Sequence, residues 1–290
     1  MKIVCIPAYN EEKNIGDIVK RSLAHVDKVI VCDDGSKDNT AKVARENGAE
    51  VISHKTNLGK GAAVKSLFKR AKELGAEVTV TIDGDGQFLP EEIPKLMSQI
   101  IEKKSDIVLG YRFGINSDIP SHRRFGNKVI AKMASTASNL PIRDAETGFR
   151  AYSKKAIELI EFDSNNFGMD AEILVNASKK GLKITEEDVR VIYNTGGRTS
   201  SKNTVSLFAD MVTNLIELIA IHHPLKFLGL PGLGLMVMGL AFGIYVISLF
   251  NETRLFSIPS SVVAVGSFTI GLMLLLMSAV LFSISKTRKK

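Results

Sequence analysis

Two long runs without a charged residue occupy the C-terminal part of the chain. Residues 227–250 and 255–285 contain no Asp, Glu, Lys or Arg, and only the segment Asn251–Arg254 separates them. Each run exceeds the roughly 20 residues that a helix needs to cross about 30 Å of hydrocarbon. The sequence therefore predicts a hairpin of two transmembrane helices, at about residues 227–250 and 260–284. A buried apolar hairpin in a soluble domain is the alternative, but two such runs in succession are unusual there.

Basic residues flank both ends of this hairpin. Lys226 precedes the first run, and residues 286–290 read Lys-Thr-Arg-Lys-Lys. Because cytoplasmic segments beside a membrane carry an excess of Lys and Arg, we expect both ends of the hairpin, and both termini, on the cytoplasmic side. Residues 2–7 have the pattern of a strand and not of an apolar leader, so we expect no secretory signal.

A proline and two glycines refine the predicted hairpin. Pro259 predicts that the second helix begins near residues 257–261, since proline is tolerated in the first turn of a helix. Gly239 and Gly243 lie four residues apart in the first helix and predict a close approach of the two backbones. Two helices per chain can pack alone or against copies of the chain, so a homo-oligomer stays open.

The first 110 residues alternate between short apolar segments and helical patterns. Strands are predicted at residues 3–6, 28–32, 49–53, 78–82 and 106–109, and helices at 12–22, 40–47, 62–74 and 90–102. This alternation predicts an α/β fold, Rossmann-like, with a mostly parallel sheet and helices on both faces. In such sheets, ligands bind beyond the carboxyl ends of the strands. The loops that follow the strands are therefore the candidate site.

Two carboxylates and an amide follow the fourth predicted strand. Asp83, Asp85 and Gln87 come at alternate positions directly after the segment Val-Thr-Val-Thr-Ile at residues 78–82. Carboxylate and amide oxygens are ligands for Mg²⁺ or Mn²⁺, and these ions usually keep positions open for substrate phosphates. The pattern predicts a metal site for a nucleotide-diphosphate substrate. An acidic turn that caps a strand uses the same residue types and is the alternative.

Polar residues also follow the other predicted strands. Pro7, Tyr9 and Glu11 follow the first strand, Asp34 the second, and Lys60 the third. Four polar loops at one edge of a sheet favour a substrate site over a set of structural turns. The Gly-Lys-Gly segment around Lys60 lacks the spacing of a P-loop, and no GxGxxG motif opens a helix in this part of the chain, so a dinucleotide cofactor is disfavoured.

The chain after the predicted sheet contains more polar clusters, at residues 123–127, 143–150, 169–174 and 193–202. Apolar residues then recur at helical spacing over residues 204–224. They predict an amphipathic helix at the membrane interface, and a helix packed on the first domain fits equally well. We therefore predict three parts, a cytosolic domain at residues 1–203, a juxtamembrane helix at 204–224 and the hairpin at 225–290.

The net charge of +7 does not require a nucleic-acid partner. A cytosolic domain beside an anionic lipid leaflet explains a basic chain equally well, and no basic and aromatic residues alternate in a stacking pattern. Cys5 and Cys32 are the two cysteines of the chain, and both fall in predicted strands. We expect them to be small buried side chains in a reducing compartment.

Four motifs, in this order, resemble the inverting GT-A glycosyltransferases. They are Pro-Ala-Tyr-Asn-Glu at residues 7–11, Asp-Asp-Gly-Ser at 33–36, Asp-Gly-Asp-Gly-Gln at 83–87 and Asp-Ala-Glu-Thr-Gly-Phe-Arg at 144–150. Together with the segment Arg198–Lys202 and the C-terminal hairpin, they are similar to the polyprenyl-phosphate sugar synthases, such as the dolichyl-phosphate mannose and glucose synthases. The resemblance covers roughly residues 1–205 and implies a GT-A fold for them.

The resemblance also implies roles for single residues. Asp34 would contact the nucleotide, in a pocket shaped by Pro7, Tyr9 and Glu11, and we place Lys60 in the same group. Asp83, Asp85 and Gln87 would hold the metal, with Asp85 as a direct ligand. The basic candidates for contacts to the donor diphosphate and the acceptor phosphate are Arg112, Arg123, Arg124, Arg150, Arg198 and Lys202, with Ser201 in the segment that closes on the diphosphate. Gly84 stands where the family often has alanine, which leaves the ligand spacing intact.

The implied activity is transfer of a hexose from GDP-mannose or UDP-glucose to dolichyl or polyprenyl phosphate, with inversion. A lipid monophosphate is largely dianionic at cytosolic pH, so little general-base help is needed. Asp144 or Glu146 would orient the sugar or the acceptor. The alternatives are a membrane glycosyltransferase that extends a lipid-linked saccharide and a catalytically silent scaffold that binds nucleotide sugars. The first is disfavoured because the chain has no tryptophan for the Gln-x-x-Arg-Trp motif of processive synthases.

Overall fold

The computed structural model describes residues 1–114, 131, 135, 140–163, 169–192 and 225–287. The chain divides into two compact units, Met1–Leu215 and Ile216–Lys290. The predicted amphipathic helix at residues 204–224 lies outside the described residues, as do the predicted boundaries at 203 and 224. These boundaries stay predictions.

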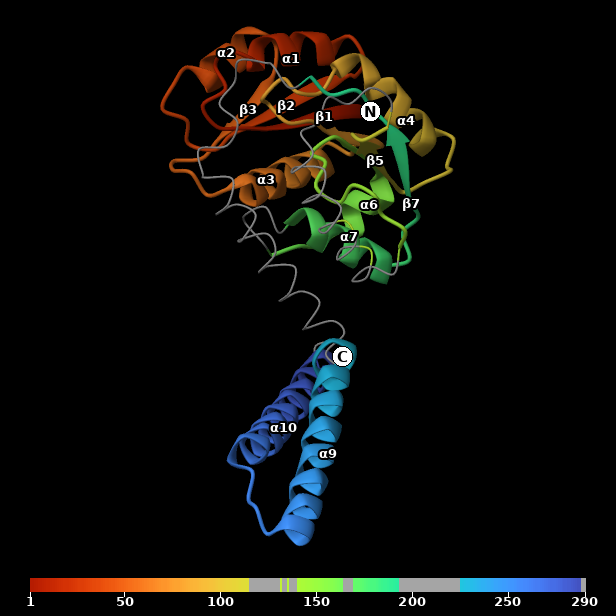
Figure 1. The fold of residues 1–290 in the computed structure, drawn as a ribbon. Helices are drawn as coiled ribbons and strands as arrows, with labels where there is room; N and C mark the ends of the chain where they lie inside the picture. The colour runs from red at the N-terminus through yellow and green to blue at the C-terminus, as the bar shows by residue number, and fades with distance from the viewer. Residues whose placement is uncertain (115–130, 132–134, 136–139, 164–168, 193–224, 288–290) are drawn as a thin grey trace. The chain divides into compact units, whose positions relative to one another are not determined.

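A seven-stranded sheet forms the centre of the first unit (Figure 1). Its strands are β1 (Lys2–Ala8), β2 (Lys28–Asp33), β3 (Glu50–Ser53), β4 (Val78–Thr81), β5 (Ile107–Tyr111), β6 (Arg150–Ser153) and β7 (Ile184–Asp188). The order across the sheet is β3-β2-β1-β4-β6-β5-β7. Only β6 is antiparallel to its neighbours among these strands, because it pairs with β4 and β5 in the opposite direction.

Helices cover both faces of the sheet (Figure 1). In chain order they are α1 (Ile15–Leu23), α2 (Thr40–Glu46), α3 (Lys60–Glu73), the short 3-10 helix η1 (Pro90–Glu92), α4 (Ile93–Ile101), α6 (Lys154–Leu159) and α7 (Met169–Lys179). The first five strands and four helices expected from the sequence are confirmed within a few residues. The α/β fold with a mostly parallel sheet is therefore confirmed.

Alternate residues of the strands face the two layers of helices. On β1, Val4 and Ile6 pack into a core with α1 and α4, whereas Ile3 and Cys5 pack on α3. This is the period-two alternation of a strand that is covered on both faces. The two cysteines are buried and free, as expected. The helices on both faces hold the strands in place. The polar loops follow directly at the ends of these strands.

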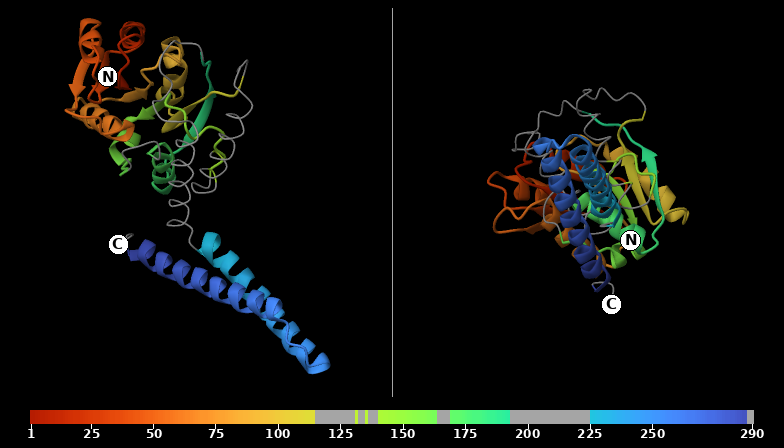
Figure 2. Two further views of the ribbon diagram at one scale, coloured as in Figure 1. Left: turned by 60° about the vertical axis from the view of Figure 1, so that its left-hand side comes forward. Right: turned by 60° about the horizontal axis from the view of Figure 1, so that its bottom comes forward.

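The second unit is a pair of antiparallel helices (Figure 2). A π-helical turn, η2 (Leu225–Gly229), leads into α9 (Leu230–Thr253), and α10 spans Ile258–Thr287. Both helices are long and apolar enough to cross a membrane, with a mean hydropathy of 2.2, and only 11% and 17% of their apolar windows are buried. Such exposure of apolar side chains favours the transmembrane alternative over a hairpin buried in a soluble core.

Glycines lie where α9 and α10 are in contact. Of the two glycines that we expected there, Gly239 is at the contact and Gly243 is not. A Cβ at Gly239 would lie 2.7 Å from the backbone nitrogen of Phe268, and one at Gly271 would lie 2.7 Å from that of Met236. The expectation for Gly243 is wrong, since a Cβ there would meet no atom within 4 Å.

Candidate active site

The carboxylate of Asp83 is held from two sides just beyond the end of β4. Its Oδ1 lies 2.7 Å from Nζ of Lys60, the first residue of α3. Its other side rests on Gly148, where an added Cβ would lie 2.0 Å from Oδ2. Thr81 of β4 donates a hydrogen bond of 3.0 Å to the carbonyl of Gly148, which keeps the two segments together. The loop before β6 therefore passes directly beside the predicted metal ligand.

Asp85 shares this acidic region with Glu11. The Oδ1 of Asp85 accepts a hydrogen bond of 3.0 Å from the backbone of Gln87, and its carbonyl accepts one of 3.1 Å from Asn14. Burial, and then the charge of Asp83, raises the pKa of Asp85 to about 6. Burial, and then the charge of Asp85, raises the pKa of Glu11 to about 7. In both carboxyl groups, burial and a neighbouring negative charge favour the protonated form.

The loop after β1 is tied to the loop after β2. The backbone nitrogens of Asn10 and Glu11 donate to the hydroxyls of Ser36 and Thr40, at 2.9 and 2.8 Å. Pro7 is half-buried and Tyr9 is exposed beside them. The structure thus brings together the ends of β1, β2 and β4, as the sequence predicts.

Asp34 is buried and holds the loop between β3 and α3. It accepts hydrogen bonds from the backbone nitrogens of Leu58 and Gly59, at 3.0 and 2.8 Å. Nδ1 of His54 lies 2.7 Å from its Oδ1, and Nε2 of His54 lies 2.9 Å from the hydroxyl of Ser66 on α3. The predicted contact of Asp34 with a nucleotide stays a prediction. What the structure adds is that Asp34 positions the start of α3 and so Lys60.

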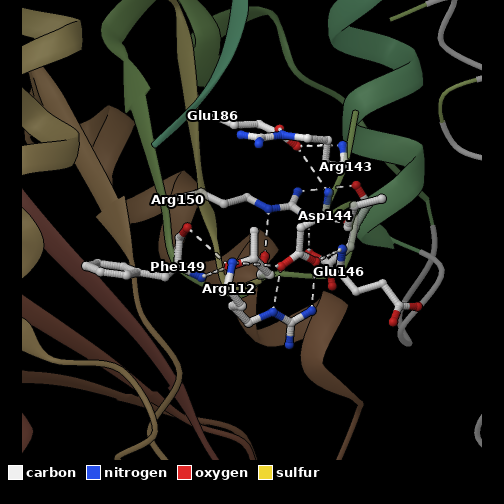
Figure 3. Close-up of polar contacts among 10 residues, drawn as sticks. Arg112, Arg143, Asp144, Glu146, Phe149, Arg150 and Glu186 are labelled. Carbon is white, nitrogen blue, oxygen red and sulfur yellow. Dashed lines mark hydrogen bonds and ion pairs between the residues drawn. The ribbon is translucent and has the colours of Figure 1, made fainter. Parts of the chain in front are cut away.

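Asp144 forms a two-pronged ion pair with Arg112 (Figure 3). The Nε and Nη2 atoms of Arg112 each lie 2.7 Å from one oxygen of Asp144, which is buried. Glu186 of β7 fixes this segment, because it accepts from the backbone nitrogens of Arg143 and Asp144. Arg112, following β5, and Asp144 are thus predicted site residues that the fold brings together.

Arg150 is buried, which corrects our expectation that it approaches a phosphate. It starts β6, only 1% of it is exposed, and its Nη2 lies 2.9 Å from Oδ1 of Asp170 on α7. It also donates to the carbonyls of Thr147 and Ala145, at 2.8 and 2.7 Å. Arg150 therefore holds the loop at residues 144–149 in place (Figure 3). This is a positioning role, because the guanidinium faces the protein interior.

The described part of the site has more carboxyl groups than basic groups. Three carboxylates are paired, in the ion pairs Asp83–Lys60, Asp144–Arg112 and Asp170–Arg150. Glu11, Asp85 and Glu146 form no ion pair within the described ranges. Burial is the main cause that raises the pKa of Glu146 to about 7, with Arg112 opposing it. A surplus of half-buried carboxyl groups among the described residues suits a divalent cation.

The donor set fits a metal that is completed by its substrate. Asp83 and Asp85 offer carboxylate oxygens at one strand end, and Mg²⁺ is commonly bound by one or two carboxylates plus substrate phosphates. Over the described residues, no group of three or more His, Cys, Asp and Glu side chains is arranged to hold a metal by itself.

Residues 3–160 match the family described as glycosyl transferase family 2. The chain belongs to this family. Five of its predicted site residues, Arg123, Arg124, Arg198, Ser201 and Lys202, lie outside the described residues.

Two relatives are about one-third identical to this family 2 chain over the residues that align. The UDP-N-acetylglucosamine–dolichyl-phosphate N-acetylglucosaminyltransferase of Methanococcus voltae is 33% identical over 65% of this chain and 84% of its own length. The dolichyl-phosphate hexose transferase of Haloferax volcanii is 33% identical over 63% of this chain and 79% of its own. The resemblance to the polyprenyl-phosphate sugar transferases is thereby confirmed.

A solved structure supports the fold. Glucosyl-3-phosphoglycerate synthase from Mycobacterium tuberculosis, crystallised with Mn²⁺ and UDP-glucose, is 21% identical, with a TM-score of 0.60 over 76% of this chain and 78% of that chain. At this level of identity the likeness shows the fold alone. The expected GT-A fold is confirmed for the family 2 domain.

Sequence reasoning did not assign roles to His54, Gly148 and Asp170. Asp170 falls in a polar cluster that the sequence does mark, at residues 169–174, but its partner Arg150 lies 20 positions away. Gly148 is 65 residues from Asp83 in the chain. The pairing of β4 with β6 brings Gly148 and Asp83 close together, and this pairing is not visible in the sequence.

Proposed function

We propose that this family 2 protein transfers a hexose from GDP-mannose or UDP-glucose to dolichyl or polyprenyl phosphate, with inversion, on the cytosolic face of a membrane. The observation that carries the proposal is the pair of carboxylates at the end of β4, set among described site residues that include more acids than bases. The names of the two relatives support a dolichyl-phosphate acceptor. The apolar helices α9 and α10 support an acceptor that is confined to a membrane.

Asp83, Asp85 and Gln87 are the residues that would hold Mg²⁺ or Mn²⁺. The ion would supply Lewis-acid stabilisation of the charge on the departing nucleoside diphosphate. A fold neighbour crystallised with Mn²⁺ and UDP-glucose supports this role for a divalent ion. Pro7, Tyr9, Glu11 and Asp34 line or support the nucleotide pocket in this proposal.

The acceptor needs little activation. A phosphate oxygen of the lipid attacks the anomeric carbon, the bond from that carbon to the donor diphosphate breaks, and the electron pair leaves on the diphosphate. Because the lipid phosphate is largely dianionic near neutral pH, no protein base has to remove a proton. Arg112, held by Asp144 at the end of β5, and the undescribed Arg123, Arg124, Arg198 and Lys202 are the proposed cations that bring two anions together.

Glu146 and Asp144 have different proposed tasks. Asp144 has both oxygens on Arg112 and so fixes the direction of that guanidinium. Glu146 is mostly buried beside this pair, with a raised pKa of about 7, and is the proposed hydrogen-bonding partner of the sugar or the acceptor. The juxtamembrane helix at 204–224 would set the height of the site above the lipid.

A panel of donors tests the proposal. Purified full-length protein in detergent is incubated with polyprenyl phosphate, Mg²⁺ and one labelled donor at a time, namely GDP-mannose, UDP-glucose or UDP-N-acetylglucosamine. We expect one donor to yield label that extracts into organic solvent, with release of the matching nucleoside diphosphate. The same mixture without polyprenyl phosphate is the control and should give neither.

Two outcomes would contradict the proposal. Binding of a nucleotide sugar without any transfer to lipid phosphate would support the silent scaffold instead. Transfer only to a preformed lipid-linked saccharide would support an enzyme that extends such saccharides.

A further inference from the structure

Lys60 contacts a residue that the proposed function assigns to the metal. Its Nζ lies 2.7 Å from Oδ1 of Asp83, and the two side chains are 20% and 24% exposed. The backbone of Lys60 is held in position, because the residue begins α3 and the preceding Gly59 donates its backbone N–H to the buried Asp34. The fold therefore aims this side chain at Asp83.

The carboxylate of Asp83 has close neighbours on two sides in this arrangement. Oδ1 faces Lys60, and Oδ2 rests against Gly148, with no space there for even a methyl group. Lysine is protonated at neutral pH, so a positive charge lies where a divalent ion would have to share Asp83.

We propose that Lys60 is an internal counter-ion that neutralises Asp83 before substrate binds and that a divalent ion must displace. This inference rests on the proposed function, in which Asp83 and Asp85 hold that ion. The ion alone then binds weakly, because it competes with Lys60 for one of its two carboxylates. A nucleoside diphosphate offers Lys60 another anionic partner and brings oxygen ligands of its own.

Metal and nucleotide should therefore bind better together than apart. By thermodynamic linkage, the factor by which the nucleotide tightens metal binding equals the factor by which the metal tightens nucleotide binding. Lys60 would be a main source of this coupling. It would keep the site from capturing a metal ion that arrives without a donor.

Mn²⁺ binding to the full-length protein in detergent tests the inference, with free Mn²⁺ followed by electron paramagnetic resonance. Without nucleotide, we expect Lys60→Gln to bind Mn²⁺ about tenfold more tightly than the wild type, since a competing charge next to a carboxylate is gone. Lys60→Arg keeps the charge and should keep the weak affinity. With GDP or UDP present, the gain in Mn²⁺ affinity should be smaller in Lys60→Gln than in the wild type.

Lys69→Gln is the matched control, because it removes the same charge from an exposed position of the same helix. It should leave the Mn²⁺ affinity unchanged. Thermal unfolding of each variant verifies that it is folded.

The outcomes separate this inference from the function on which it rests. An equal or weaker Mn²⁺ affinity in Lys60→Gln, with binding that Asp85→Asn still abolishes, overturns the role of Lys60 alone. Mn²⁺ binding that Asp85→Asn does not weaken, with or without nucleotide, overturns the metal site and the inference with it.

Discussion

At the scale of single residues, the site depends on a glycine as much as on its acids. Asp83 keeps its orientation because Gly148 leaves room for its carboxylate, and Thr81 ties the two strands together beside it. The sequence predicts the acids, since carboxylates at alternate positions after a strand, together with polar loops after the other strands, favour a substrate site. It does not predict the role of Gly148, because that depends on a contact between distant segments.

Gly148→Ala should displace the Asp83 carboxylate, since the new Cβ would lie 2.0 Å from Oδ2. We expect kcat/KM for sugar transfer to fall by roughly 100-fold, the effect of a misplacement of about 1 Å at a reacting centre. Steady-state kinetics with the preferred donor measures it.

Gly84→Ala is the matched comparison, at the residue that follows Asp83 in the chain. A Cβ at Gly84 would lie 3.3 Å from the carbonyl oxygen of Pro7 and 3.4 Å or more from other atoms, so small shifts accommodate it. This variant should retain most of its activity. Equal losses in the two variants would show that the space beside Asp83 is not what matters.

At the scale of elements, β6 shows where a sequence pattern is insufficient. The cluster at residues 144–150 contains charged residues and resembles a surface loop, yet Arg150 begins a buried strand between β4 and β5. A buried arginine requires a buried partner, and Asp170 supplies it from another element. Local polarity does not reveal such a pair, so the sequence suggested a phosphate contact instead.

The C-terminal hairpin also shows that a sequence pattern predicts an element better than it predicts the contacts of that element. The lengths of α9 and α10 follow from apolar composition, and Pro259 lies in the first turn of α10 as expected. Which glycines lie at the contact depends on how the helices are rotated. Gly239 faces α10 and Gly243 does not.

Gly239→Ala should therefore destabilise the hairpin, whereas Gly243→Ala should not. Overpacking against Phe268 and Ala264 costs about 1–3 kcal/mol. Alanine at the open position 243 is neutral or slightly favourable, because it is a better helix former than glycine. Thermal unfolding in detergent, followed by far-ultraviolet circular dichroism, compares the two variants. Equal transition temperatures would contradict the observed packing.

At the scale of the whole molecule, the sequence predicts the architecture because its signals are local. Five strands, four helices and two apolar helices follow from periodicity and composition. β7 was not predicted, since Ile184–Asp188 reads Ile-Thr-Glu-Glu-Asp and has the acidic composition of a loop. It is nevertheless a strand, because it pairs with β5. It supports the site because Glu186 accepts hydrogen bonds from the backbone nitrogens of Arg143 and Asp144.

The proposed activity joins a soluble donor to a lipid acceptor. In this proposal, the family 2 domain supplies the acidic site, and the apolar hairpin would anchor it to the membrane that holds the polyprenyl chain. The central claim is that a divalent ion on Asp83 and Asp85 makes transfer possible.

Sugar transfer by Asp85→Asn in lipid vesicles tests this claim most directly. The vesicles contain polyprenyl phosphate, and the wild type and the variant receive the labelled donor with Mg²⁺, with a chelator as a further arm. We predict organic-soluble labelled product from the wild type, none after chelation, and a loss of about 100-fold or more in the variant, since a ligand charge that stabilises the departing diphosphate is removed. Full turnover by Asp85→Asn at the same Mg²⁺ concentration would contradict the account.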